Sequence, residues 1–159
     1  MILDDSARER QKLFADLIAV IREELRLAIA WNDTAAAFAG LYPTDATILF
    51  FLKEHGSATA AQVGTAAGLT TGATTAALNR LEQAGFIGRK PDKRDGRRVI
   101  VHTIQLPSQF RTIQRQTEAE LHSTLESESN ADIRSLIAHR QQINAMLARI
   151  TKRLTKPPS

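Results

Sequence analysis

Cysteine is absent from this chain of 159 residues, which excludes disulfides, thiolate metal sites and sensors based on cysteine oxidation. Aromatic residues are scarce: six Phe, one Trp and one Tyr are too few for a platform that stacks single-stranded bases. No apolar run approaches the roughly 20 residues of a membrane span. The acidic start, MILDDSARER, lacks the basic and apolar regions of a signal peptide. We therefore expect a soluble cytoplasmic protein without a membrane partner.

Residue patterns of catalytic and metal sites are also missing. The four histidines lie far apart and form no HxxxH or HExxH spacing, so solvated or locally bonded histidines are the favoured interpretation. Gly64 and Gly68 are not followed by the lysine of a phosphate-binding loop and are better explained as helix ends. No Ser/His/Asp spacing stands out. We expect no catalytic residues, no cofactor and no metal.

Positive charge, by contrast, is concentrated in one short segment. Residues 88–98, GRKPDKRDGRR, hold six basic and two acidic side chains, and 6 − 2 = +4 equals the formal net charge of the whole chain. The segment lies between Phe86-Ile87 and the β-branched run Val99-Ile100-Val101. Two short apolar strands around a basic turn that contains Asp and Gly predict a β-hairpin.

The N-terminal part predicts two helices. Apolar residues recur every three or four positions over residues 6–38, which predicts a long amphipathic helix that needs another helical surface to cover it. Pro43 interrupts the pattern. We expect Thr44 to be the N-cap of a second helix and Gly56 to end it.

Two more short helices precede the hairpin. Thr59 to Gln62 matches a capping box, which predicts a third helix that ends at Gly68. Thr70 is the expected N-cap of a fourth helix over residues 71–84, which Gly85 stops. A helix, a tight glycine turn and a helix, followed directly by a basic hairpin, are typical of a winged helix-turn-helix.

The C-terminal part is helical again. We expect one helix over residues 107–128 and a second after an Asn130 cap, with an apolar stripe too short for an extended coiled coil. The predicted fold is mainly α with a small β-hairpin wing. Packing of the last helix against the N-terminal helix, within one chain or between two, is the expected way to cover these stripes.

The segment LTTGATTAALNRLEQAGFIGRKPDKRDGRRVIV, residues 69–101, resembles the MarR family of bacterial transcriptional regulators. The resemblance rests on the recognition helix, Arg80-Leu81-Glu82, Gly85, and the wing pattern Asp92-x-x-Asp95-x-Arg97. Asn79 and Thr74 depart from the usual residues, and the LTxxG segment after the second wing strand is missing.

The resemblance implies a homodimer whose two recognition helices enter successive major grooves of a pseudo-palindrome, with the wings in adjacent minor grooves. Residues 41–103 would form the winged module, and residues 1–40 and 104–159 the helical dimerisation region. Many relatives are repressors that small ligands release.

The start of the recognition helix holds the candidates for base reading, because an exposed helix end fits the major groove. They are Thr70, Thr71, Ala73, Thr74, Thr75 and Ala76. Thr70 is better explained as a cap, and Thr74 has an alternative as part of the core; for Thr71 and Thr75 we favour DNA. Arg80 is the one basic residue of this helix, and contact with phosphate or pairing with Glu82 or a wing acid remain open for it.

The wing holds the candidates for phosphate binding. Cations that bind phosphate release counterions, so we expect DNA affinity to depend steeply on salt. They are Arg89, Lys90, Lys93, Arg94, Arg97 and Arg98. Phosphate would repel Asp92 and Asp95, so we expect these acids to structure the turn, and the family pattern implies an Asp95–Arg97 bridge. Arg94 is the minor-groove candidate, with Lys93 as its neighbour. The alternative is a solvated charged loop.

Three aromatic residues, Trp31, Phe38 and Tyr42, lie where a ligand pocket between dimer helices and winged module is expected. Such walls suit a small aromatic effector. Each residue taken alone is better explained as part of the core or of an interface.

The leading hypothesis is a non-enzymatic, homodimeric regulator that binds specific double-stranded DNA and responds to a ligand, as a repressor. One alternative is an architectural DNA-binding protein, which predicts binding without operator preference. Another is a protein–protein adaptor on a winged-helix fold, which predicts a stable dimer with weak DNA affinity.

Overall fold

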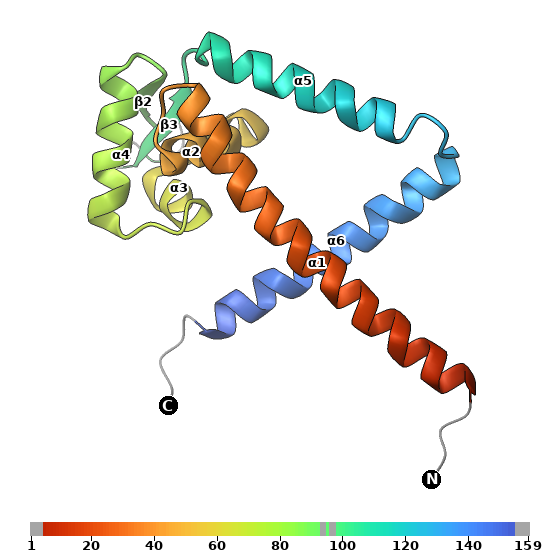
Figure 1. Cartoon of the computed structure of the whole chain (residues 1–159). Coiled ribbons are helices and arrows are strands. Elements are labelled where there is room, and N and C mark those ends of the chain that lie inside the picture. The colour runs from red at the N-terminus through yellow and green to blue at the C-terminus, as the bar shows by residue number, and fades with distance from the viewer. Residues whose placement is uncertain (1–4, 93–94, 96–97, 155–159) are drawn as a thin grey trace. The chain divides into compact units, whose positions relative to one another are not determined.

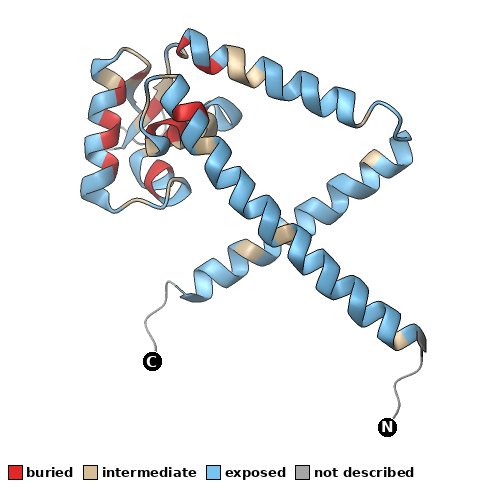
Figure 2. Ribbon diagram, viewed as in Figure 1, coloured by how far each residue is buried: buried red, intermediate tan, exposed pale blue. Residues whose placement is uncertain are grey.

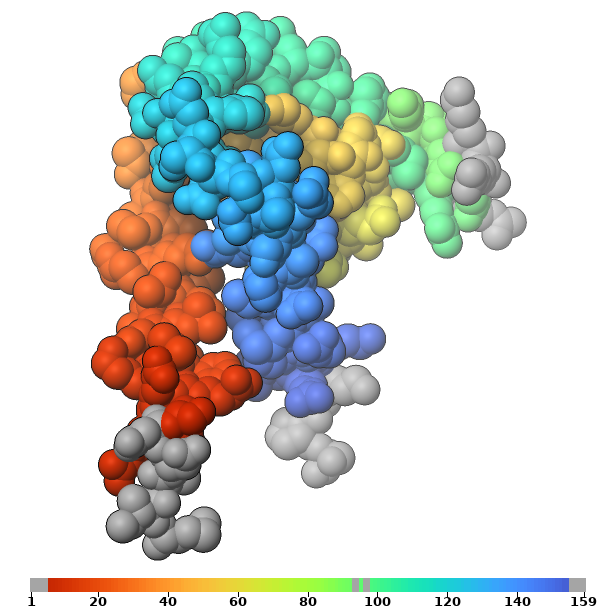
Figure 3. Space-filling view, turned by 90° about the vertical axis from the view of Figure 1, so that its right-hand side faces the viewer, coloured from red at the N-terminus to blue at the C-terminus, as the bar shows by residue number. Residues whose placement is uncertain are grey.

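The computed structural model of the chain describes residues 5–92, 95 and 98–154; the other residues are grey in Figures 1 and 3. The chain divides into two compact units, Met1–Gln114 and Arg115–Ser159. Most described residues are helical, and three short strands form a single antiparallel sheet. The predicted fold, mainly α with a small β wing, is therefore confirmed.

The first unit starts with the long helix α1 (Asp5–Phe38), drawn in red to orange in Figure 3. Helix α2 (Pro43–His55) follows a short turn. The expected Thr44 cap is wrong: Pro43 already occupies the first turn, where its missing N–H has no helical partner to lose, and Tyr42 holds the cap position without a side-chain bond. Among the described residues, no single helix is long and apolar enough to cross a membrane; only the bent pair of α1 and α2 passes together.

Helices α3 (Ala60–Ala66) and α4 (Thr71–Gln83) form the helix-turn-helix. The predicted capping box is confirmed, because the Thr59 hydroxyl accepts from the Gln62 N–H and the Gln62 side chain accepts from the Thr59 N–H. Gly85, with a φ of 75°, ends α4 in a Schellman motif in which the Phe86 N–H donates to the Leu81 carbonyl at 2.9 Å.

The sheet has the order β1-β3-β2 and consists of β1 (Ser57–Thr59), β2 (Ile87–Pro91) and β3 (Val99–Thr103). Strands β2 and β3 form the predicted hairpin, with Arg89 opposite Val101. The sequence did not predict β1, which lies between α2 and α3 and places Ala58 opposite Val101. Ala58, Ile87 and Val101 are buried, so this face of the sheet packs on the helices.

The buried residues gather in the module of α2, α3, α4 and the sheet, shown in red in Figure 2. Ile48, Leu49 and Leu52 of α2 are fully buried. The start of α5 (Ser108–Thr124) completes this core, since Phe110 is buried and its ring centroid lies 4.4 Å from that of Phe50.

The second unit contains the end of α5 and helix α6 (Asn130–Leu154). The Ser129 hydroxyl accepts from the Asp132 N–H at 3.2 Å, so Ser129 rather than the expected Asn130 caps α6. No residue of α6 is buried, although Leu136, Ile137 and Ile150 are large and apolar.

Candidate nucleic-acid interface

Helix α4 has one buried and one exposed side. Thr74, Ala77, Leu78 and Leu81, at three- and four-residue spacing, are buried in the module. Thr71, Gly72, Ala73, Thr75 and Ala76 in the first turns are exposed. Because α4 follows the tight turn after α3, its N-terminal end stands at the surface of the helix-turn-helix.

Two of the six threonine and alanine candidates have structural roles. The Thr70 hydroxyl accepts from the Ala73 N–H at 3.3 Å, which confirms Thr70 as the cap of α4. Thr74 is only 5% exposed, and its hydroxyl donates to the Thr70 carbonyl at 2.9 Å. A Cβ on Gly64 would lie 2.5 Å from Thr74 Oγ1, so α3 and α4 cross closely at this point. Thr74 is therefore a core residue, which corrects its inclusion among the DNA contacts.

The remaining exposed candidates carry short side chains. The Thr75 hydroxyl donates to the Thr71 carbonyl at 3.0 Å. A Cβ added to Gly72 would have no neighbour within 4 Å, so the protein itself does not require glycine there. Thr71 and Thr75 also line a hollow of about 300 Å³ between α3 and α4. This end of α4 can approach another surface closely.

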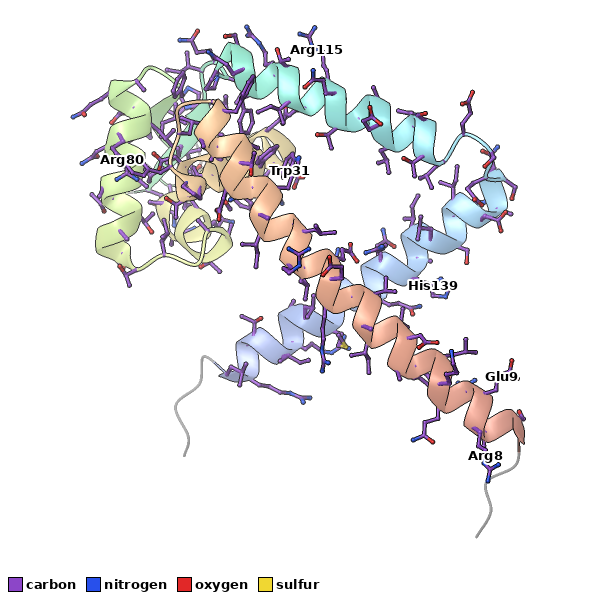
Figure 4. All side chains as sticks on the ribbon, in the orientation of Figure 1. Arg8, Glu9, Trp31, Arg80, Arg115 and His139 are labelled. Atoms are coloured by element: carbon purple, nitrogen blue, oxygen red, sulfur yellow. The ribbon has the colours of Figure 1, made fainter. Side chains whose placement is uncertain are left out.

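Arg80, which is labelled on α4 in Figure 4, does not pair with Glu82 or a described wing acid. It binds Asp45 of α2. Its Nη2 and Nε donate to the two carboxylate oxygens of Asp45 at 2.7 and 3.1 Å. The guanidinium also lies 4.7 Å from the centre of the Tyr42 ring. Hydrogen bonding to Asp45 raises the pKa of Arg80 above its ordinary value. The pair joins residues 35 positions apart, and no local pattern could predict it.

Arg89 of β2 reaches back to α4. It forms an ion pair with Glu82 at 3.0 Å, and its Nη2 donates to Asn79 Oδ1 at 2.7 Å. Asn79, a departure from the usual family residue, therefore holds the wing against the recognition helix. Lys90 is exposed on the next position of β2. The two cations of this strand thus have different surroundings.

The wing turn is held partly by its backbone. The Asp92 N–H donates to the Arg98 carbonyl at 2.8 Å, and the Arg98 N–H donates to the Asp95 carbonyl at 2.9 Å. Asp95 also forms an ion pair with Arg98 at 3.4 Å. Asp95 thus takes part in the turn through its side chain, and Asp92 through its backbone N–H. Lys93, Arg94 and Arg97, and with them the implied Asp95–Arg97 bridge, lie outside the described residues.

The three candidate pocket residues have separate surroundings. Trp31, which is labelled on α1 in Figure 4, is near Phe50, with ring centroids 5.6 Å apart. It also lines a hollow on α1 with Val20 and Leu27. Tyr42 contacts Arg80, while Phe38 is 64% exposed. Within the described part of the first unit, the three aromatic side chains thus have different neighbours. Among the described residues, no three histidine or acidic side chains are grouped to hold a metal ion.

The fold and the arrangement of α3, α4 and the hairpin define a winged helix-turn-helix. Residues 41–99 match the family model of the MarR family. The uncharacterized HTH-type transcriptional regulator YcgE of Bacillus subtilis (strain 168) is 36% identical over 92 residues. The match covers 58% of this chain and 60% of that protein, less than two thirds of its length.

Solved structures share the fold along most of the chain. A MarR family transcription regulator covers 94% of this chain and 99% of its own, with a TM-score of 0.68 and 21% identity. The structure of NadR in complex with 4-hydroxyphenylacetate covers 84% of this chain and 92% of its own, with a TM-score of 0.58 and 21% identity. The predicted resemblance to the MarR family is confirmed, because residues 41–99 match the model of that family.

Proposed function

We propose that this protein is a sequence-specific, double-stranded-DNA-binding transcriptional regulator. The observation that carries the proposal is that one module combines the exposed N-terminal end of α4 with a basic hairpin. An α-helix end fits the roughly 12 Å major groove, and a wing can follow the backbone into the adjacent minor groove. Thr71, Ala73 and Thr75 would face the bases, and the wing cations would face phosphate.

The division of labour within the wing follows from its contacts. Arg89 is held by Glu82 and Asn79, so it positions the hairpin and brings less charge to phosphate. Lys90, with Lys93, Arg94 and Arg97 of the turn, would supply most of the electrostatic attraction. Arg98, which is exposed and paired with Asp95, would add to it. Each cation that neutralises a phosphate releases counterions, so affinity falls steeply with salt.

Two copies of the chain would bind one operator. Large apolar side chains of α1 are exposed at helical spacing, among them Phe14, Leu17 and Leu25, and α6 has no buried residue. Such faces call for a helical partner. We assign residues 1–40 and 104–159 to a dimerisation region and residues 41–103 to the DNA-binding module. A two-fold dimer matches a pseudo-palindrome with half-sites about one helical turn apart.

The proposal extends to regulation by a small aromatic effector. In it, the protein is a cytoplasmic repressor that the effector releases from DNA. The fold is shared with NadR, whose structure holds 4-hydroxyphenylacetate. Trp31 and Phe38 belong to the C-terminal part of α1, and Tyr42 lies in the turn before α2. A ligand that prefers dimers with wrongly spaced recognition helices would lower DNA affinity by no more than its differential affinity for the two forms.

Selection of bound duplexes from a random DNA pool at near-physiological salt tests the function. We expect enrichment of a palindrome with half-sites about one helical turn apart. Binding without enrichment would favour an architectural protein, and a stable dimer that binds no duplex would favour an adaptor. On the selected site, the Arg94→Ala/Arg97→Ala variant should bind more weakly and still dimerise; unchanged affinity would contradict the wing assignment.

A further inference from the structure

Apart from Gln83, the side chains of α3 and α4 that are able to read a base with two hydrogen bonds are engaged within the protein. Such readers are arginine, lysine, asparagine and glutamine. Gln62 completes the capping box of α3, and Asn79 Oδ1 accepts from Arg89. Arg80 binds Asp45 with two hydrogen bonds. Neither Asn79 nor Arg80 can offer a base its full set of atoms without losing a contact inside the protein.

Gln83 does not fill this role, because it is the last residue of α4. It lies 12 residues after Thr71, about 18 Å farther along the helix axis. The helix end that can enter a major groove therefore carries methyl and hydroxyl groups in place of charged or amide groups. These belong to Thr71, Ala73, Thr75 and Ala76.

Thr75 presents its hydroxyl and its methyl in different ways. Its hydroxyl proton is used in the bond to the Thr71 carbonyl, so the oxygen is left only as an acceptor. This bond also selects the side-chain rotamer and thus fixes the direction of the methyl group. Thr75 is exposed, so its methyl group can contact a base without a change of rotamer.

Resting on the proposed function, we propose that α4 reads the C5-methyl groups of thymine and that Thr75 is the residue that sets this specificity. Thymine carries the only methyl group of the major groove, and threonine and alanine methyls pack against it. Guanine offers only acceptors there, N7 and O6, which an acceptor-only hydroxyl cannot satisfy, so their desolvation opposes binding. The half-site thus has A·T pairs with thymine facing α4.

Replacement of thymine by deoxyuridine in the selected operator tests methyl reading directly, since it removes the methyl and keeps every hydrogen-bonding atom. We expect about fourfold weaker binding for each half-site in which one contacted thymine is replaced. In a symmetric operator, replacement in both half-sites should weaken binding about 16-fold. Deoxyuridine placed outside both half-sites is the DNA control and should change nothing.

Two variants assign the effect to Thr75. Thr75→Ser keeps the hydroxyl and loses the methyl, so it should bind the thymine operator more weakly and show no further loss on the deoxyuridine operator. Thr75→Val keeps a methyl and should retain the preference for thymine. Thr34→Ser on α1 is the matched control, because the Thr34 hydroxyl donates to the Ala30 carbonyl in the same way, at 2.8 Å.

The outcomes separate this inference from the proposed function. Equal affinity for thymine and deoxyuridine operators, or selected half-sites with guanine facing α4, would overturn methyl reading while DNA binding stands. A Thr75→Ser variant that keeps the wild-type preference for thymine would overturn the assignment to Thr75. A folded protein that binds no duplex would instead overturn the proposed function itself.

Discussion

The winged module and the long helices differ in how far their apolar side chains are buried. In the module, Ile48, Leu49 and Leu52 are each 0% exposed, and the sheet and α4 close over them. In α1, Phe14 is 52% and Leu17 47% exposed, and α6 buries no residue at all. The module therefore has its own hydrophobic core, whereas the helices expose the apolar surface that the proposed dimer would bury.

The largest expected effect comes from charging the exposed apolar face of α1. Leu17→Glu should convert the dimer to monomers, because the desolvation of a carboxylate opposes burial at the interface. Loss of the second recognition helix should then weaken operator binding by about 10²-fold or more. Light scattering and titration of labelled operator measure the two effects. Ala19→Glu, on another side of the same helix, is the control and should stay dimeric; a dimeric Leu17→Glu variant would contradict this interface.

A stability effect within the module should follow from breaking the pair between α2 and α4. Arg80→Met leaves the buried Asp45 carboxylate without its partner and should lower the free energy of unfolding by about 2–3 kcal/mol. Urea denaturation measures this loss. Adding Asp45→Asn should recover part of the stability, since the two changes are coupled. Fully additive losses would show that the pair contributes little.

Two glycines of the helix-turn-helix should respond in opposite ways. Gly64→Ala forces Thr74 aside and should lower the free energy of unfolding by about 1–3 kcal/mol. Gly72→Ala meets open space and should leave stability unchanged or raise it by up to about 1 kcal/mol. Its operator affinity should nevertheless fall about tenfold, the cost of one lost close contact with DNA. Unchanged affinity of Gly72→Ala would place this helix end away from the bases.

The smallest effect is expected at Lys90 of the wing. Lys90→Ala should weaken binding to all sequences alike and reduce the slope of log affinity against log salt by about 1. The measurement is a titration of operator and unrelated duplex at several salt concentrations. Lys12→Ala on α1, which removes a cation paired with Asp16, should leave the slope unchanged. Equal slopes for both variants would remove Lys90 from the phosphate contacts.

Local signals were enough to predict the helices, the hairpin and the caps at Thr59 and Thr70, since each depends on neighbouring residues. The burial of Thr74 was also readable, because it continues the spacing of Leu78 and Leu81. Strand β1 has only three residues and no alternation long enough to detect. The partners of Arg80 and Arg89 could not be predicted, because only the folded chain brings Asp45 and Asn79 to them.

Strand β1 has one more consequence for the proposed regulator. Because β3 pairs with β1 on one side and β2 on the other, the wing strands share one sheet with the segment between α2 and α3. Within each copy, the sheet thus ties the base of the wing to the helix-turn-helix. An effector would then change only the spacing between the recognition helices of two copies, relative to the DNA repeat of about 10.5 base pairs per turn. Repression would depend on whether this spacing matches the distance between the two half-sites.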